Sequence, residues 1–566
     1  MEKEAPIVEA GTAQVPEVLP EDAIFDEEGK RRLQEEKPYF GKRPARAVAI
    51  DLAIWLLMTA YAVAVFVKGK DKDGFHLFTV IWVFVTLRLL ARHISMSKLI
   101  YDPLGKVWTS TVGAAASKFP SWLVWAALLV ATLVGLLLMA IFTTGRPSTV
   151  GERLQSWGGV LFFLLIAAGS SRKVKAINLQ TVAVGVFFQF IFALIVLRTT
   201  VGANIFQWIS SFVTGFLKYS HNGLEFLFGP VPNQNFVINV LPAIIFFCAF
   251  ISIVYYWGGM QYAVQKMGAI MMRLMDTSGA ESIVAAASPF VGQVENAMLV
   301  LPFIEYMTKS ELHAVMTCGF ATISGSVLLG YVLIVGDAYL ILTACIMSIP
   351  ASLALTKMRY PEEEESLTKG RVVVPESEDK ASNFLHAAAN GAATGAQLVI
   401  LISATILAIV ALYQAANGLV GWAFDIIDVH RDSPDPANPG PHDTWISITY
   451  ILSFVFYPFA WCLGVSANQA RLAGEIMAQK LLLNEFVAFS NLGDFNKAGR
   501  VNQRTFQLLA FALCGFANLG STGIQVSALG AISPKRKKDL AELAVSAMLI
   551  GNLSTWMTAA VAGCMI

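Results

Sequence analysis

The stretch that decides the fold reads KLLLNEFVAF, from Lys480 to Phe489. It places the Glu485 carboxylate beside the amide of Asn484 within a long apolar segment. A second apolar segment contains GQVEN, from Gly292 to Asn296, which includes Glu295. A charge inside a bilayer is costly, so it normally faces a cavity and marks a substrate or ion path. We therefore expect both stretches to line an internal polar site; the alternative is that each Glu is only a helix cap or a buried, hydrogen-bonded group.

The composition indicates an integral membrane protein. Of the 566 residues, 55% are apolar and 14% are charged, whereas soluble domains average about 25% charged residues. The net charge of +1 provides no basic footprint, so we expect no nucleic-acid partner. The six cysteines lie in apolar segments without a C-x-x-C pair, which predicts neither a disulfide frame nor a metal site.

Apolar runs of spanning length recur along the chain. A helix needs about 20 such residues to cross roughly 30 Å of hydrocarbon. The segment 204–228 is amphipathic and aromatic, which predicts an interfacial helix instead of a span. The fold class is therefore an all-α integral membrane protein with about 11 transmembrane helices. The predicted spans lie at 46–67, 75–95, 121–144, 157–171, 178–199, 236–258, 328–352, 396–424, 444–466 and 541–563.

Three regions differ in character. Residues 1–45 are charged and have no signal-peptide core, so they predict a disordered cytoplasmic tail. Residues 46–145 would form three peripheral transmembrane helices, and 150–566 the transporter core with scaffold and transport domains. Basic residues precede the first span, and a second basic cluster at 535–538 precedes the last. By the positive-inside tendency, the N-terminus is expected in the cytoplasm and the C-terminus outside.

The chain contains an internal echo. The tetrapeptide CGFA occurs at 318–321 and again at 514–517, each time followed by a polar, glycine-bearing stretch. Paired interrupted segments in two halves point to a transporter site near the midplane, where freed backbone groups line a cavity. We expect an inverted internal repeat with two re-entrant hairpins, at 279–306 and 470–500. Unwound helices would follow at 312–336 and 503–530; a chance tetrapeptide match is the alternative.

At these residues the sequence resembles the concentrative nucleoside transporters. The family signature [GA]-x-K-x-x-x-N-E-F-V-A-aromatic is matched by AQKLLLNEFVAF at 478–489. Supporting matches are GQ-x-E at 292–295, TKSELHA at 308–314 and CGFAN at 514–518. The similarity runs from about residue 175 to the C-terminus and is less diagnostic before that point.

The resemblance implies a homotrimer in the plasma membrane, in which each protomer carries one nucleoside such as uridine or adenosine. Carried over by position, Gln293 and Glu295 would face the nucleobase. Glu485 would hold the ribose hydroxyls together with Asn518 and Ser521. Apolar walls for the ring would come from Val327 and Phe516. No cofactor is expected.

The coupling ion depends on a departure from the family pattern. Sodium-dependent members carry N-I-F-x-G-Q-T-E, whereas this chain reads SPFVGQVE from Ser288 to Glu295. A partial Na⁺ site remains possible at Ser288, Val291, Thr322 and Ile323. A buried carboxylate at Glu295 or Glu485 could instead bind a proton. Because the SPFVGQ form also resembles fungal, proton-coupled members, we expect H⁺ coupling, with Na⁺ as the alternative.

Other protein classes fit less well. The sequence has no H-E-x-x-H, P-loop or G-x-S-x-G motif, so we do not expect an enzyme. A passive channel stays open as an alternative, and transport against a gradient would distinguish the two. The pair Gly391 and Gly395 predicts close helix packing.

Overall fold

The structure is a computed structural model, and it describes most of the chain after residue 44. The chain divides into two units, 1–69 with 82–102, and 70–81 with 103–566. The described residues are 45–68, scattered positions between 78 and 89, 119–143, 145, 148–229, 241–293, 296, 299–364, 366, 369, 381–430 and 445–566.

The first unit contains α1 (Ala45–Lys68), which agrees with the span predicted at 46–67. The Trp82 indole donates a hydrogen bond to the Thr59 hydroxyl over 3.2 Å. The predicted tail, and most of the predicted span 75–95, lie outside the described residues. The division into a tail, three peripheral helices and a core stays a prediction.

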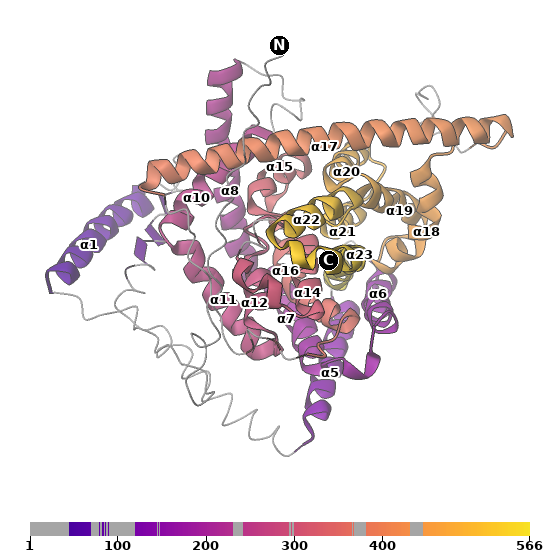
Figure 1. The fold of residues 1–566 in the computed structure, drawn as a ribbon, viewed down its shortest axis with the longest axis horizontal. Helices are drawn as coiled ribbons and strands as arrows, with labels where there is room; N and C mark the ends of the chain where they lie inside the picture. Colours follow the sequence, from indigo (N-terminus) through magenta and orange to yellow (C-terminus); the bar gives the residue numbers. More distant parts are fainter. Residues whose placement is uncertain are drawn as a thin grey trace, which may run out of the picture. The chain divides into compact units, whose positions relative to one another are not determined.

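In the second unit, every secondary-structure element among the described residues is a helix (Figure 1). It runs α5 (Ser121–Phe142), α6 (Val150–Gly169), η4 (Val174–Ala176), α7 (Leu179–Arg198), α8 (Thr200–Phe228), α10 (Leu241–Tyr256), α11 (Gly259–Met275), α12 (Gly279–Ala287), η5 (Leu301–Tyr306), α14 (Lys309–Ala321), α15 (Gly325–Val335), α16 (Ala338–Arg359), α17 (Phe384–Ile426), α18 (Ile448–Cys462), α19 (Ala467–Leu482), α20 (Glu485–Lys497), α21 (Gln503–Leu513), α22 (Leu519–Ile532), η6 (Pro534–Arg536) and α23 (Lys537–Gly563).

Within the described ranges, five helices are long and apolar enough to cross a membrane. A sixth span results if α18 and α19, which meet at a bend of 118°, are counted together. The all-α membrane class agrees with these helices, whereas the predicted count of about 11 exceeds this number. The chain breaks within both predicted hairpins and both predicted unwound helices, although their re-entrant character stays a prediction.

The predicted span 328–352 is wrong. Helix α15 ends at Val335, and α16 begins only at Ala338. Between them Gly336 adopts φ 77°, a left-handed conformation that suits glycine. Asp337 then caps α16 by accepting bonds from the backbone N–H groups of Tyr339 and Leu340. The apolar run therefore contains a helix end and a helix start.

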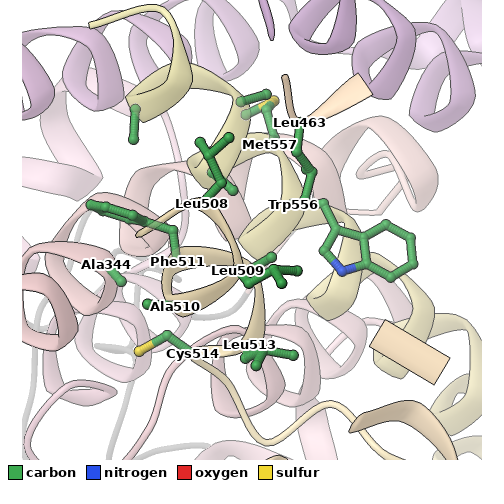
Figure 2. Packing of buried hydrophobic residues seen from close by; sticks show 14 of the residues in the cluster. Ala344, Leu463, Leu508, Leu509, Ala510, Phe511, Leu513, Cys514, Trp556 and Met557 are labelled. Carbon is green, nitrogen blue, oxygen red and sulfur yellow. The ribbon is translucent and has the colours of Figure 1, made fainter. Parts of the chain in front are cut away.

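The core of this unit lies around α21 and α23. Figure 2 shows side chains of α21, including Leu509 and Phe511, packed among residues of neighbouring helices. Trp556 of α23 lies edge-on to Phe456, with ring centroids 5.8 Å apart. Most residues of both helices are buried, because protein surrounds them. In a membrane this close packing, more than release of water, holds helices together.

Helix α17 is 43 residues long, well beyond the predicted span 396–424. It packs along α10 where two glycines remove side chains. A Cβ at Gly391 would lie 2.5 Å from the Cys248 carbonyl oxygen, and one at Gly395 would lie 2.8 Å from the Ile245 Cα. Both contacts are closer than a side chain permits, which confirms the predicted packing role of this pair.

Candidate functional site

Glu485 lies at the centre of a buried hydrogen-bonded group. Its two carboxylate oxygens accept one bond each, from the Tyr331 hydroxyl over 2.7 Å and from the Asn518 amide over 2.8 Å. All three side chains are at most 3% exposed. These partners come from α20, α15 and the start of α22. A buried carboxylate with charge-assisted bonds on both oxygens is held in one orientation.

Two helix starts fix this geometry. Glu485 is the first residue of α20, because Asn484 caps the helix by accepting a bond from the Val487 N–H. Asn518 caps α22 in the same way, and its side-chain oxygen accepts from the Ser521 N–H over 2.7 Å. The nitrogen of that same amide is the one that reaches Glu485. Capping thus aims one end of Asn518 at the carboxylate.

Tyr331 is a member of the site that the sequence did not indicate to us. Its ring is fully buried and packs against Phe486, with centroids 4.6 Å apart, and Phe489 at 5.2 Å. It lies four residues after Val327, so both fall on one face of α15. This spacing in the sequence could have indicated Tyr331, because it places a hydroxyl one helical turn after Val327, which was predicted to pack against the nucleobase.

The two CGFA segments meet in space. The backbone N–H of Phe516, in the break between α21 and α22, donates to the Thr322 carbonyl, in the break after α14, over 3.3 Å. A Cβ at Gly515 would lie 2.7 Å from the Phe320 carbonyl oxygen, so only glycine allows this approach. Each break therefore supplies backbone groups to the other, as expected of paired unwound helices.

A buried lysine supports the second hairpin. The Lys480 ammonium is 1% exposed and donates to the Asn552 side-chain oxygen of α23 over 2.5 Å. The Asn552 amide donates in turn to the Ala517 carbonyl over 3.0 Å. The signature lysine thereby ties α19 to the residue just before Asn518.

The first hairpin is less fully bonded. The Ser288 hydroxyl donates to the Val284 carbonyl over 2.7 Å and accepts from the Asn296 amide over 3.0 Å. The side-chain oxygens of Asn296 and Gln293 are buried and have no hydrogen-bond partner. Glu295 lies outside the described residues.

The residues proposed for an ion approach one another across this region. A Cβ at Gly325 would lie 3.1 Å from the Phe290 carbonyl oxygen, which brings the segment before Val291 against the segment after Ile323. The Thr322 hydroxyl donates to the Cys318 carbonyl over 3.1 Å. Among the described residues, no group of three or more His, Cys, Asp or Glu side chains could hold a metal ion.

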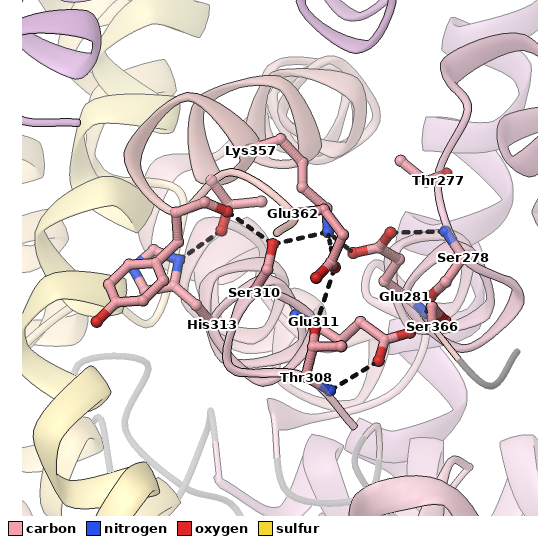
Figure 3. Close-up of polar contacts among 12 residues, drawn as sticks. Thr277, Ser278, Glu281, Thr308, Ser310, Glu311, His313, Lys357, Glu362 and Ser366 are labelled. Carbon is pink, nitrogen blue, oxygen red and sulfur yellow. Dashed lines mark hydrogen bonds and ion pairs between the residues drawn. The ribbon is translucent and has the colours of Figure 1, made fainter. Parts of the chain in front are cut away.

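A buried ionic network holds both ends of the first hairpin (Figure 3). The Lys357 ammonium lies 2.9 Å from a Glu281 carboxylate oxygen and 3.1 Å from one of Glu362, and it donates to the Ser310 hydroxyl over 2.8 Å. Capping boxes start both helices: Ser278 caps α12 and Thr308 caps α14, and the Glu281 and Glu311 carboxylates accept from the backbone N–H groups of these caps. No motif in the sequence indicates this network.

A separate cavity of about 610 Å³ lies on another face of the second hairpin. Residues at helical spacing line it, 475 and 479 on α19, 483 just after its end, and 487 and 491 on α20. They lie opposite residues of α17 and of the start of α18. None of the predicted site residues line this cavity.

Three family models match the chain in succession. They are described as Na⁺ dependent nucleoside transporter N-terminus at 158–231, Nucleoside recognition at 237–338, and Na⁺ dependent nucleoside transporter C-terminus at 340–563. The uncharacterized transporter YutK of Bacillus subtilis (strain 168) is 37% identical over 416 residues, a match that covers 72% of this chain and 99% of YutK. The chain belongs to the concentrative nucleoside transporter family.

Other relatives of this family member carry more specific names. Sodium/nucleoside cotransporter 2 of Rattus norvegicus is 35% identical over 450 residues, covering 76% of this chain but only 65% of its own length. The match thus spans about two-thirds of the mammalian relatives. A solved structure of CNTnw, in an inward-facing substrate-bound state, aligns with a TM-score of 0.66 at 36% identity and covers 73% of this chain and 98% of its own. These names favour sodium over the proton coupling that we expected from the sequence.

Proposed function

We propose that the protein is a symporter that moves nucleosides across a membrane. The observation that carries this proposal is the Glu485 carboxylate, buried where two broken helices meet and bonded to Tyr331 and Asn518. Family membership provides the substrate class. An intramembrane carboxylate in such a place is typical of a substrate or ion path.

The ribose would bind at the fully bonded side of the site. Glu485 accepts hydrogen bonds, and sugar hydroxyls donate them, so a nucleoside could share or replace the Tyr331 and Asn518 donors. Ser521 lies beside Asn518 at the start of α22 and would add a hydroxyl contact. A substrate without a ribose hydroxyl would lack a charge-assisted bond to this carboxylate, so it should bind more weakly.

The nucleobase would lie toward the first hairpin. The side-chain oxygen of Gln293 is buried and has no hydrogen-bond donor, so an N–H of the base could bind it. Glu295 is assigned there by family position alone. Val327 is 4% exposed, and Phe516 is partly buried against the same core, so both suit apolar walls.

Sodium is the coupling ion that the named relatives favour. Its oxygen ligands would come from Ser288, Val291, Thr322 and Ile323. Asn296 adds a structural argument, because its amide nitrogen binds Ser288 while its oxygen has no partner. That oxygen could supply the carbonyl ligand that sodium-dependent members place at the position of Ser288.

Proton coupling is the second candidate, and two residues favour it. Ser288 is shorter than the asparagine of sodium-dependent members, and Val294 has no hydroxyl. Under this candidate a carboxylate, Glu295 or Glu485, would carry the proton.

The deciding experiment measures uridine and adenosine uptake in proteoliposomes over a matrix of sodium concentration and pH. Sodium symport predicts accumulation against a gradient that requires inward sodium and stops when ionophores dissipate it. Accumulation in choline that rises as external pH falls would replace sodium with the proton. Equilibration without accumulation under any gradient would indicate a channel and contradict the proposal.

We further propose that the protein forms a homotrimer in the plasma membrane, with a cytoplasmic N-terminus and an external C-terminus. Much of α17 is exposed in the single chain, which leaves a long apolar surface for lipid or other copies. The mass of the purified protein in detergent tests the assembly. A monomeric mass would contradict it.

A further inference from the structure

Gln525 is a buried glutamine that lies outside the family signature at 478–489. Its side chain is fully buried, and its oxygen has no hydrogen-bond partner. It lies on α22, seven residues after Asn518 and four after Ser521. Residues at these spacings share one face of a helix, so Gln525 extends the face that carries both proposed ribose contacts.

The orientation of this side chain is fixed by its other end. The Gln525 nitrogen donates to the Met316 carbonyl of α14 over 3.3 Å. The amide must therefore present its oxygen away from that carbonyl, as an acceptor. The amide nitrogen has a second N–H, but the oxygen is the atom that has no partner, so it is the group left for a ligand to bind.

Gln525 and Gln293 flank the same glycine. A Cβ at Gly319 would lie 2.9 Å from the Gln525 nitrogen and 3.2 Å from the Gln293 Cβ. Both glutamines have a buried oxygen without a partner. Two bare acceptors thus lie in one region, between the first hairpin and the substrate face of α22.

A bare acceptor alone does not make a site, and the chain offers the comparison. Gln189 of α7 is also fully buried with an unpartnered oxygen, but its nitrogen binds Thr558 of α23. It shares no helix face with Asn518. Gln525 differs because it lies on the helix face of the site and adjoins a residue assigned to the nucleobase.

We propose that Gln525 accepts an N–H from the exocyclic amine of the nucleobase and makes the transporter prefer amino nucleosides. Adenine and cytosine carry such an amine, whereas hypoxanthine and uracil carry a carbonyl oxygen at the matching position. That oxygen would face the bare oxygen of Gln525, and neither could donate. The inference rests on the proposed nucleoside transport and identifies the part of the base that is read.

The first test uses the unaltered protein. Competition for uptake is measured with adenosine, purine riboside and inosine, and with cytidine against uridine. Losing a buried hydrogen bond should weaken affinity about fivefold to tenfold. Adenosine should therefore bind more tightly than purine riboside and inosine, and cytidine more tightly than uridine. Equal affinities, or a preference for inosine and uridine, would overturn the inference.

The second test replaces the acceptor with an apolar side chain of similar size. Gln525→Leu should reduce the adenosine-to-inosine and cytidine-to-uridine preferences to near one. Gln189→Leu is the matched control and should retain both preferences. An unchanged preference in a transporting Gln525→Leu protein would also overturn the inference, and if that variant does not transport, the unaltered protein still decides the question.

The outcomes separate this inference from the proposed function. If the unaltered protein carries all nucleosides equally, only the role of Gln525 fails. If it binds and carries no nucleoside, the proposed function fails as well.

Discussion

The two sides of the site differ in how completely their polar groups are bonded. Around Glu485, the carboxylate and the Asn518 amide have partners at both ends, and the Tyr331 hydroxyl is engaged. Around the first hairpin, buried side-chain oxygens of Gln293, Asn296 and Gln525 have none. A buried polar group left unpaired costs about 1–3 kcal/mol. The polar groups around Glu485 are therefore held in place before substrate binds, whereas the acceptors around the first hairpin lack donors.

This difference suits the proposed substrate. Every nucleoside presents a sugar, whereas the base varies. The rigid side would bind the ribose that all nucleosides share, and the side with unpaired acceptors would distinguish their bases. Preorganisation lowers the cost of binding. Unpaired acceptors reject ligands that cannot donate, which is how buried polar groups create specificity.

The largest expected effect on uptake comes from removing the negative charge of Glu485. Glu485→Gln should abolish uptake, lowering its efficiency by at least ~100-fold, because the charge is lost and the amide nitrogen would face one of the two donors, that of Tyr331 or that of Asn518. Uptake per protein in proteoliposomes measures it, with membrane expression checked. Glu363→Gln is the control, since Glu363 pairs with Lys173 at the surface. Normal transport by the Glu485 variant would remove this residue from the site.

The next effect concerns the ends of the first hairpin. Lys357→Met leaves buried Glu281 without its cation, so we expect a loss of about 3–5 kcal/mol in the free energy of unfolding. Chemical unfolding in detergent micelles measures this loss. Lys173→Met breaks an exposed pair and should cost about 0–1 kcal/mol. Equal losses in the two variants would show that the buried network does not anchor the hairpin.

A smaller effect is expected from one hydroxyl. Tyr331→Phe removes a charge-assisted bond to Glu485, worth about 1.5–3 kcal/mol, and should weaken nucleoside affinity roughly tenfold or more. Binding of labelled uridine to the purified protein measures it. The control is Tyr339, whose hydroxyl donates to the Val196 carbonyl. The Tyr339→Phe variant should bind uridine as tightly as the unaltered protein does. A loss shared by both variants would point to general destabilisation.

The smallest effect tests the unsaturated side. Asn296→Ala removes the bare oxygen beside Ser288, so the sodium concentration for half-maximal uptake should rise severalfold while proton dependence stays absent. Asn296→Asp keeps an oxygen there and should retain the sodium response. An alanine variant with an unaltered sodium response would exclude Asn296 as a ligand.

The sequence was sufficient for the class of fold and for part of the site. Glu485 could be named because a carboxylate in apolar surroundings is conspicuous, and Asn518 because it follows the second CGFA segment and matches the family motif; the structure brings them together. Tyr331 and Gln525 were missed because their importance depends on which helix face turns inward. In an apolar helix the polar pattern alone does not reveal that face.

Two errors had local causes. The predicted span 328–352 ignored Gly336 and Asp337, a glycine end signal followed by a capping residue, because hydropathy averages over both. The network around Lys357 joins residues 281, 310 and 362, and no spacing in the sequence indicates a contact among them.

The length of α17 has a consequence for the membrane. At 1.5 Å per residue, its 43 residues extend roughly 65 Å, whereas a bilayer with its headgroups is about 40–45 Å thick. Its sequence carries one acidic residue, Asp425, next to its end, so water is a poor environment for most of its length. The helix must therefore incline by about 45° or more, far beyond the average of about 20°. A helix at this inclination extends about as far parallel to the membrane plane as it does across the bilayer.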